Sequence, residues 1–405
     1  MVHKPIQAYK KIKKAKDAVD EEWEKLEGKR ERKNGKKSIA WDVKAVKPRA
    51  EVEQRARDEG IVVHFGELMA LCHLKNAELA EFLQRYKGRI VFRGDGVKDA
   101  EGFYAVFTEQ GASASHMSAT KFVDAVSHFP GNTGEDSDAI GAYTQIPLAD
   151  AARLLGIGVL PETWIKLPKD RQPKEWEGIE DPVCPLLQNL YGHPLAGLLW
   201  EKGCHEKLIA EGFERLQGWE SLYVHREMKL FLNIYVDDFH MAGKKESMQP
   251  MWERLGKHLD LEDAVPFDGH VYLGCEQRDI EPNAELVFEK TQLFQQIMKT
   301  KTGPKGNAMD EQGEATKQFT EQFAEKHKSK SSTRKQRKQR HASAASNAAA
   351  AEHCKQTMKN VKAWEYRMIG SAEATVDRYL ELSKLKITSL KKVSTPCIDD
   401  HLLAP

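Results

Sequence analysis

Two adjacent aspartates lie in the middle of an apolar stretch of this chain. The segment 228–243 reads MKLFLNIYVDDFHMAG, so a run of β-forming residues stands on each side of Asp237 and Asp238. This pattern predicts a β-hairpin with both acids at its tip. Neighbouring carboxylates repel each other and lose hydration in apolar surroundings, so their presence here requires either an exposed turn or a compensating cation.

The four-residue sequence alone does not decide between an exposed turn and a cation site. Asp is common in turns, and the pair could simply close the hairpin. Alternatively, carboxylates bind hard divalent cations, and two Mg²⁺ ions held about 3.5–4 Å apart activate a hydroxyl and stabilise a leaving pyrophosphate. That chemistry needs a further carboxylate, for which Asp138 and Asp136 are the candidates. We prefer Asp138, because only it has an aromatic residue five positions later.

Composition divides the chain into four parts and excludes several classes of protein. The parts are a basic charged N-terminal segment (1–40), a folded core (41–300), a basic and Ala-rich low-complexity linker (301–352) and a small strand–helix segment (353–405). The six cysteines form no C-x-x-C pair, which argues against a zinc finger and favours a reducing compartment. No stretch is apolar and long enough to span a membrane, and no apolar leader follows the N-terminus. These features predict an intracellular protein without a membrane partner and do not distinguish cytoplasm from nucleus.

Charge is unevenly distributed although the net charge is only +1. Basic residues dominate 1–38, and the tract 326–340 contains no acid. Such runs indicate either a polyanionic partner or solvated tails.

Strands and helices intermix in the core without regular βαβ alternation, which predicts an α+β fold. The expected strands are 88–93 and 271–273, and segment 138–148 reads as a strand end, a turn and a short helix. In the helix predicted over 200–213, the spacing places Trp200, Cys204, Leu208 and Ile209 on a buried face. Outside the core we expect the segment 1–40 to be helical in part, with Ile6, Tyr9 and Ile12 at helical spacing. We also expect a strand over 364–368 and a helix N-capped by Ser371.

Five short motifs, in order along about residues 60–300, resemble those of copia-type retrotransposon reverse transcriptases. Segment 87–94 (KGRIVFRG) is similar to the copia fingers sequence K-A-R-L-V-A-R-G, and segment 138–148 (DAIGAYTQIPL) to the first palm motif. Segment 190–192 (LYG), followed by Trp200, resembles the start of L-Y-G-L-K-Q-A-P-R-A-W. The Y-V-D-D hairpin and then segment 272–274 (YLG) complete the series. Each motif is weak alone, but their order makes the resemblance specific.

The resemblance implies an RNA-directed DNA polymerase domain with a right-hand palm, fingers and a partial thumb. Two Mg²⁺ ions, replaceable by Mn²⁺, would be the cofactors, and the partners would be an RNA template, a DNA or RNA primer and deoxynucleoside triphosphates. The catalytic and metal-binding residues implied are Asp138, Asp237 and Asp238. The nucleotide-binding residues implied are Lys87, Arg89, Ala139, Tyr143 and Tyr235, with Tyr143 excluding the 2′-hydroxyl of ribonucleotides. The primer and template residues implied are Tyr191, Gly192, Tyr272, Leu273 and Gly274.

One departure from the family concerns a residue that touches nucleotide and template. Where the family has L-K-Q-A-P-R, this chain has His193-Pro194-Leu195-Ala196-Gly197-Leu198, so the glutamine is replaced by Leu195. A degenerate copy that keeps the fold and at most binds nucleic acid is therefore the alternative. A third possibility is a basic interaction protein that works through 1–40 and 326–340. The chain also resembles one piece of a longer polyprotein.

Overall fold

The computed structural model describes residues 3–31, 35, 37–77, 81–105, 107, 117–281, 287, 293, 362–368 and 371–390. The linker predicted over 301–352 and the basic tract 326–340 lie outside these residues. The chain divides into two compact units, of which the first comprises Met1–Gln277 with Tyr366–Pro405 and the second Arg278–Glu365. The first unit contains almost all of the described structure.

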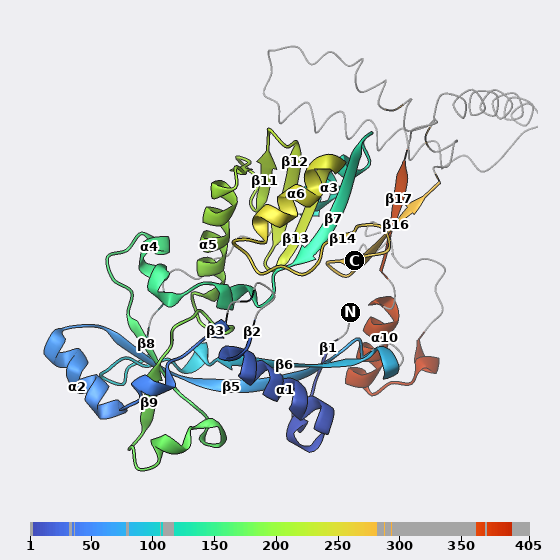
Figure 1. The fold of residues 1–405 in the computed structure, drawn as a ribbon. Helices are drawn as coiled ribbons and strands as arrows, with labels where there is room; N and C mark the ends of the chain where they lie inside the picture. The colour runs from blue at the N-terminus through green and yellow to red at the C-terminus, as the bar shows by residue number, and fades with distance from the viewer. Residues whose placement is uncertain are drawn as a thin grey trace, which may run out of the picture. The chain divides into compact units, whose positions relative to one another are not determined.

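The first sheet of this unit is built around one long strand, β5, which serves three neighbours. The order is β1-β5-β8-β9-β4, and β6 also pairs with β5 (Figure 1). The first half of β5 runs parallel to β8, and its second half runs antiparallel to β6. The strands are β1 (His3–Pro5), β4 (Lys47–Pro48), β5 (Val63–Lys75), β6 (Arg85–Phe92), β8 (Glu162–Lys166) and β9 (Pro182–Pro185).

Helix α1 (Lys13–Leu26) packs along β6 and joins the core of this sheet. Its buried side chains recur at helical spacing, as expected for an amphipathic helix. They are Ala15, Val19, Trp23 and Leu26. The same core cluster contains Trp41 and Ile90, so it crosses the boundary expected at residue 40. Helix α2 (Arg49–Glu59) packs in a smaller cluster and ends at Gly60 in the left-handed conformation.

The segment 1–40 is helical in part, as predicted, but its helix is α1, and Ile6, Tyr9 and Ile12 lie before that helix. Ile6 extends the pairing of β1, because its N–H donates to the carbonyl of Cys72 (2.8 Å), and only a 3-10 turn covers Tyr9–Lys11. The strand pairing satisfies backbone groups that an isolated turn of helix would leave to water.

The second sheet is entirely antiparallel and has the order β10-β11-β12-β13-β7-β14 (Figure 1). The period-2 alternation along β12 and β13 assigns side chains to two faces. Leu232 and Met241 face the cluster that contains helices α5 and α6, whereas Phe231 and Ala242 face α3. The strands are β7 (Asn132–Asp138), β10 (Glu214–Arg215), β11 (Leu222–His225), β12 (Leu230–Tyr235), β13 (Asp238–Lys244) and β14 (Val265–Pro266). The helices are α3 (Met117–Ser127), α5 (Ala196–Ala210) and α6 (Lys245–Leu255).

Helix α5 confirms most of the predicted buried face but not all of it. Trp200, Cys204 and Leu208 are buried, whereas Ile209 is 45% exposed. One residue turns the helix by about 100°, so Ile209 cannot share the face of Leu208.

The remaining described elements are small. A hairpin of β2 (Glu27–Glu31) and β3 (Lys37–Ile39) follows α1, and β15 (Val271–Tyr272) pairs with the start of β16 (Cys275–Ile280). Helix α4 (Ala151–Leu155) precedes β8. The predicted C-terminal strand and helix are present as β17 (Ala363–Arg367) and α10 (Ser371–Ser383). The fold is α+β, as predicted.

Candidate active site

The second sheet brings three aspartates together at one end. Asp138 is the last residue of β7 and lies opposite Asp238, the first residue of β13. Asp237 lies in the two-residue turn between β12 and β13, and its carbonyl accepts from the N–H of Ala139 (2.7 Å). Strand pairing and this backbone hydrogen bond therefore hold the three acids next to one another, although Asp138 is far from the hairpin in the sequence.

The turn of the hairpin has a strained backbone that α5 supports. Val236 adopts a φ of 58°, a left-handed conformation that disfavours a β-branched residue. The indole Nε1 of Trp200 donates to the carbonyl of Val236 (2.5 Å). This contact explains structurally why a tryptophan on α5 accompanies the Y-V-D-D hairpin.

The carboxylates perturb one another strongly. Burial, together with the nearby carboxylates of Asp138 and Asp237, raises the pKa of Asp238 to about 7. Near neutral pH Asp238 is therefore partly protonated, and a bound cation would displace that proton.

Asp136, the rival candidate for the third acid, has another role. Its side chain is buried, and its oxygens contact His240 (2.5 Å) and His270 (2.8 Å). Burial alone would raise the pKa of Asp136, but the two histidines outweigh it and lower the pKa. Asp138, by contrast, is exposed at the strand end and lines a cleft.

This cleft has a volume of about 350 Å³ and joins the aspartates to the first sheet. Asp138, Ala139 and Asp237 line it together with Lys87, Arg89 and Tyr191. Of the residues that the sequence singled out, these six share a single cavity.

The two cations of β6 that line the cleft, Lys87 and Arg89, have different surroundings. The guanidinium of Arg89 lies 4.4 Å above the ring of Tyr191 and 3.9 Å from Glu22 of α1. Burial and the neighbouring Arg89 and Lys75 lower the pKa of Lys87 to about 8. Lys87 forms no ion pair within the described part of the chain, so an anion entering the cleft would meet a half-buried cation.

A glycine between these cations sets the width of the cleft. A Cβ on Gly88 would lie 2.4 Å from the carbonyl oxygen of Ala18 and 2.6 Å from the Cα of Val19. Backbone atoms cannot move aside as a side chain can, so only glycine permits α1 to lie this close to β6.

Other residues singled out by the sequence lie beside the cleft. The ring of Tyr143 packs on that of Tyr191 (4.7 Å between centroids) and lines a separate small pocket with Trp200. Gly192, with a φ of 83°, lies against the backbone of Phe92. Tyr235 is the strand partner of Asp238.

The Tyr272-Leu273-Gly274 motif forms a tight turn between β15 and β16. Leu273 and Gly274 both have positive φ, at 47° and 82°. The ring of Tyr272 stacks on His240 of β13. The motif therefore lies over the second sheet, outside the cleft that Asp138 and Asp237 line.

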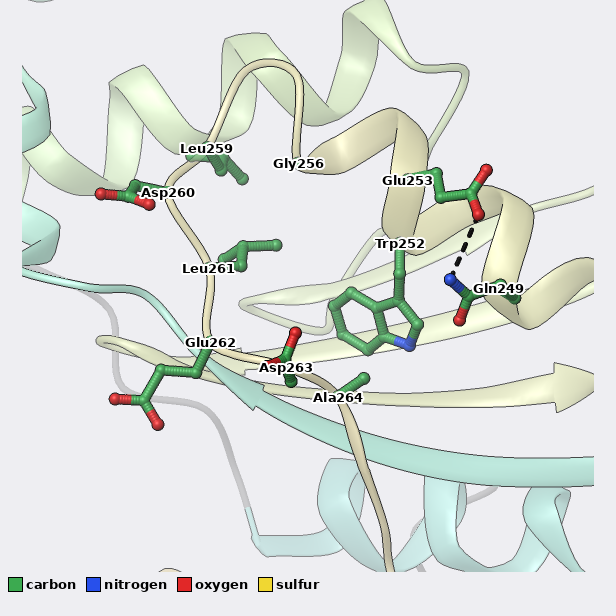
Figure 2. Close-up of a pocket in the computed structure, with 10 residues that line it drawn as sticks. All are labelled: Gln249, Trp252, Glu253, Gly256, Leu259, Asp260, Leu261, Glu262, Asp263 and Ala264. Carbon is green, nitrogen blue, oxygen red and sulfur yellow. Dashed lines mark hydrogen bonds between the residues drawn. The ribbon is translucent and has the colours of Figure 1, made fainter. Parts of the chain in front are cut away.

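The loop after α6, which the sequence did not single out, supports the aspartates. The N–H of Glu262 donates to the carbonyl of Asp138, and the N–H of Ile140 donates to the carbonyl of Asp260 (both 2.8 Å). Figure 2 shows this loop, which lines a separate acidic pocket of about 330 Å³ with Trp252 of α6. Glu262 lines both this pocket and the cleft. Because these two hydrogen bonds join backbone groups, the pattern of side chains in the sequence could not predict them.

Leu195, which stands where the reverse transcriptases that this chain resembles have a glutamine, is 7% exposed and belongs to the core of the second sheet. The backbone at this position begins α5, and the side chain faces the core instead of the cleft. This position therefore supplies no polar contact to a ligand.

The aspartates suit Mg²⁺ by the chemistry of their donors, because hard cations prefer carboxylate oxygens. Within the described ranges, no three His, Cys, Asp or Glu side chains are grouped closely enough to hold a metal ion.

No protein-family model matches the chain, and a search of curated proteins also finds no match. None of the helices in the described ranges is both long and apolar enough to cross a bilayer.

Proposed function

We propose that this chain is the polymerase domain of a copia-type reverse transcriptase, with the first sheet as fingers and the second as palm. The observation that carries the proposal is the strand pairing of Asp138 with Asp238, together with the cleft that Asp138, Asp237, Lys87 and Arg89 all line. Nucleotidyl transfer needs carboxylates on one side of a triphosphate and cations on the other.

In this proposal Asp138 and Asp237 would hold the metal ions, helped by the carbonyl of Ala139, and Asp238 would be a supporting carboxylate. Bound Mg²⁺ would supply activation of the primer hydroxyl and neutralisation of the leaving pyrophosphate. Lys87 and Arg89 would bind the triphosphate of the incoming deoxynucleotide. Tyr143 would lie beneath its sugar and exclude a 2′-hydroxyl, and the turn with Tyr272 would hold the primer.

Primer extension on a homopolymer RNA template tests the proposal. Wild-type protein should extend the primer with Mg²⁺ or Mn²⁺, and Asp237→Asn should not, because it removes one metal-binding charge. Asp58→Asn, on the exposed part of α2, is the matched control and should behave as wild type. A wild-type protein that makes no product across a range of salt, Mg²⁺ and Mn²⁺ concentrations would refute the polymerase proposal.

The buried Leu195 favours one alternative, a degenerate copy that binds nucleic acid without turnover. Such a protein should bind a primer–template with an affinity that falls with salt, and Asp237→Asn should leave that affinity unchanged or increased. Binding without extension would decide for this alternative.

The possibility that 1–40 acts as a separate basic arm receives less support. Ala15, Val19, Trp23 and Leu26 are buried in the core of the first sheet. Removing α1 would therefore unfold part of the core instead of deleting a tail.

A further inference from the structure

A buried histidine lies directly behind the paired aspartates. On β13, His240 follows Asp238 by two residues and therefore lies on the same face of the sheet. On β7, Asp136 precedes Asp138 by two residues, and Asp136 is the strand partner of His240. The His240–Asp136 pair is thus the next same-face pair after Asp238–Asp138.

Both ring nitrogens of His240 contact carboxylates. Nδ1 lies 2.5 Å from Asp136 Oδ1, and Nε2 lies 2.9 Å from Oδ1 of Asp124 on α3. Each ring nitrogen thus lies within hydrogen-bonding distance of a carboxylate oxygen. His240 therefore joins β13 to β7 and to α3 through its two ring nitrogens.

The second oxygen of each carboxylate also has a partner. His270 Nδ1 contacts Asp136 Oδ2 (2.8 Å), and the Tyr366 hydroxyl donates to Asp124 Oδ2. The network is thus fully connected, which is the condition under which a buried polar network adds rigidity.

The ring of His240 is also held between two aromatic side chains. Phe267 stacks on one side at 3.9 Å between centroids and an interplanar angle of 9°. Tyr272, from the turn assigned to the primer, stacks at 4.3 Å and 24°. Phe267 can reach this place because it lies on Gly134 of β7, where a Cβ would come within 2.2 Å of the ring. His240 therefore contacts both the strands of the paired aspartates and the hairpin of Tyr272.

A network of this kind is a costly way to fill a core. Burying ionised groups costs several kcal/mol per ion, and apolar side chains of the same size fill such a space at least as stably. This cost is explained if the network fixes the positions of neighbouring side chains more tightly than apolar packing would. Residues that hydrogen-bond to metal ligands do this in many proteins.

We propose that His240 is a positioning residue, which keeps Asp138 and Asp238 opposed and seats the Tyr272 turn at a fixed place relative to them. The catalytic consequence rests on the proposed polymerase function, but the effect on the geometry of the aspartates does not.

Two readouts on His240→Asn test this inference. The first is hydrogen exchange at the amide of Ala139, whose bond to the Asp237 carbonyl reports the closure of the strand ends. The second is the split between kcat and the deoxynucleotide KM in primer extension. The matched control is His225→Asn, because His225 is also buried in this sheet, on β11, and bonds only to the backbone near it.

We expect His240→Asn to increase exchange at Ala139 selectively, while peptides from β11 stay protected. The kcat per folded molecule should fall about 10- to 100-fold with the nucleotide KM little changed, as when residues behind metal ligands are altered. His225→Asn should lower the melting temperature without either effect.

The outcomes separate this inference from the proposed function. Retained protection at Ala139 in His240→Asn, or a loss spread evenly over the sheet as in the control, would overturn the inference whatever the activity. A selective loss at Ala139 in a protein whose wild type extends no primer would uphold the positioning role and refute the polymerase proposal instead.

Discussion

Replacement of His193 by asparagine should make the protein less sensitive to acid. His193 lies between the first sheet and α5, 5% exposed, with its ring packed at 5.2 Å from Phe92 and 6.0 Å from Phe107. Its Nδ1 accepts a hydrogen bond from the N–H of Leu195 (3.2 Å). An imidazolium has no acceptor nitrogen, so protonation would break this bond as well as bury a charge.

The size of the effect follows from the shift in pKa. Burial, with a smaller contribution from His64, lowers the pKa of His193 from its ordinary 6.5 to about 4. Because the folded state binds the proton less readily than the unfolded state, stability falls as pH drops below 6.5 and the loss levels off below about 4. Proton linkage gives a loss of about 2 kcal/mol at pH 5 relative to neutral pH.

The assay compares melting temperatures of wild type and His193→Asn near pH 7.5 and near pH 5. Asparagine can keep the acceptor for the Leu195 N–H but does not titrate. The other titrating groups are common to both proteins, so the acid-induced fall in melting temperature should be larger in wild type by about 4–8 °C. Equal falls in the two proteins would show that His193 is not held neutral by its surroundings, and the reasoning would be refuted.

Two further predictions concern Leu195 and Tyr143, which lie near the cleft. Leu195→Gln introduces the glutamine of the resembled reverse transcriptases but places an amide in the core of the second sheet. It should lower the free energy of unfolding by about 1–3 kcal/mol, measured from the melting temperature, and should not increase the rate of nucleotide incorporation in primer extension. Tyr143→Ala should admit ribonucleotides while keeping some deoxynucleotide incorporation, measured as the ratio of the two efficiencies; an unchanged ratio would remove Tyr143 from the sugar site.

Short sequence patterns predicted those parts of the site that lie within a single hairpin. The alternation around Asp237 and Asp238 identifies a hairpin with acids at its tip, and the structure has that hairpin. Pairing of Asp138 with Asp238 is a long-range contact, and only the order of motifs along the chain pointed to it.

Other features could not be read from the sequence for identifiable reasons. The close packing of α1 against β6 depends on the missing side chain of Gly88. A missing side chain adds nothing to the hydrophobic periodicity from which elements are predicted. His240 stands in an apolar strand, where a lone histidine looks like an ordinary core residue, and its partners Asp124 and Asp136 come from other elements. Ile209 was misplaced because it directly follows Leu208, and one residue turns the helix by about 100° away from the buried face.

The strand order of the second sheet determines when, during synthesis, the end of the sheet that carries Asp138, Asp237 and Asp238 can form. Strand β7 lies between β13 and β14, both of which are made long after it. A nascent chain that has emerged only as far as α5 carries β7 without either neighbour, so its buried Asp136 and Ser137 stay in water. Strands that must wait for distant partners fold slowly and are exposed to mispairing in the meantime. Ribosome pausing before residue 244 should therefore leave Asp138 apart from Asp237 and Asp238, because β13 supplies the strand that pairs with the end of β7.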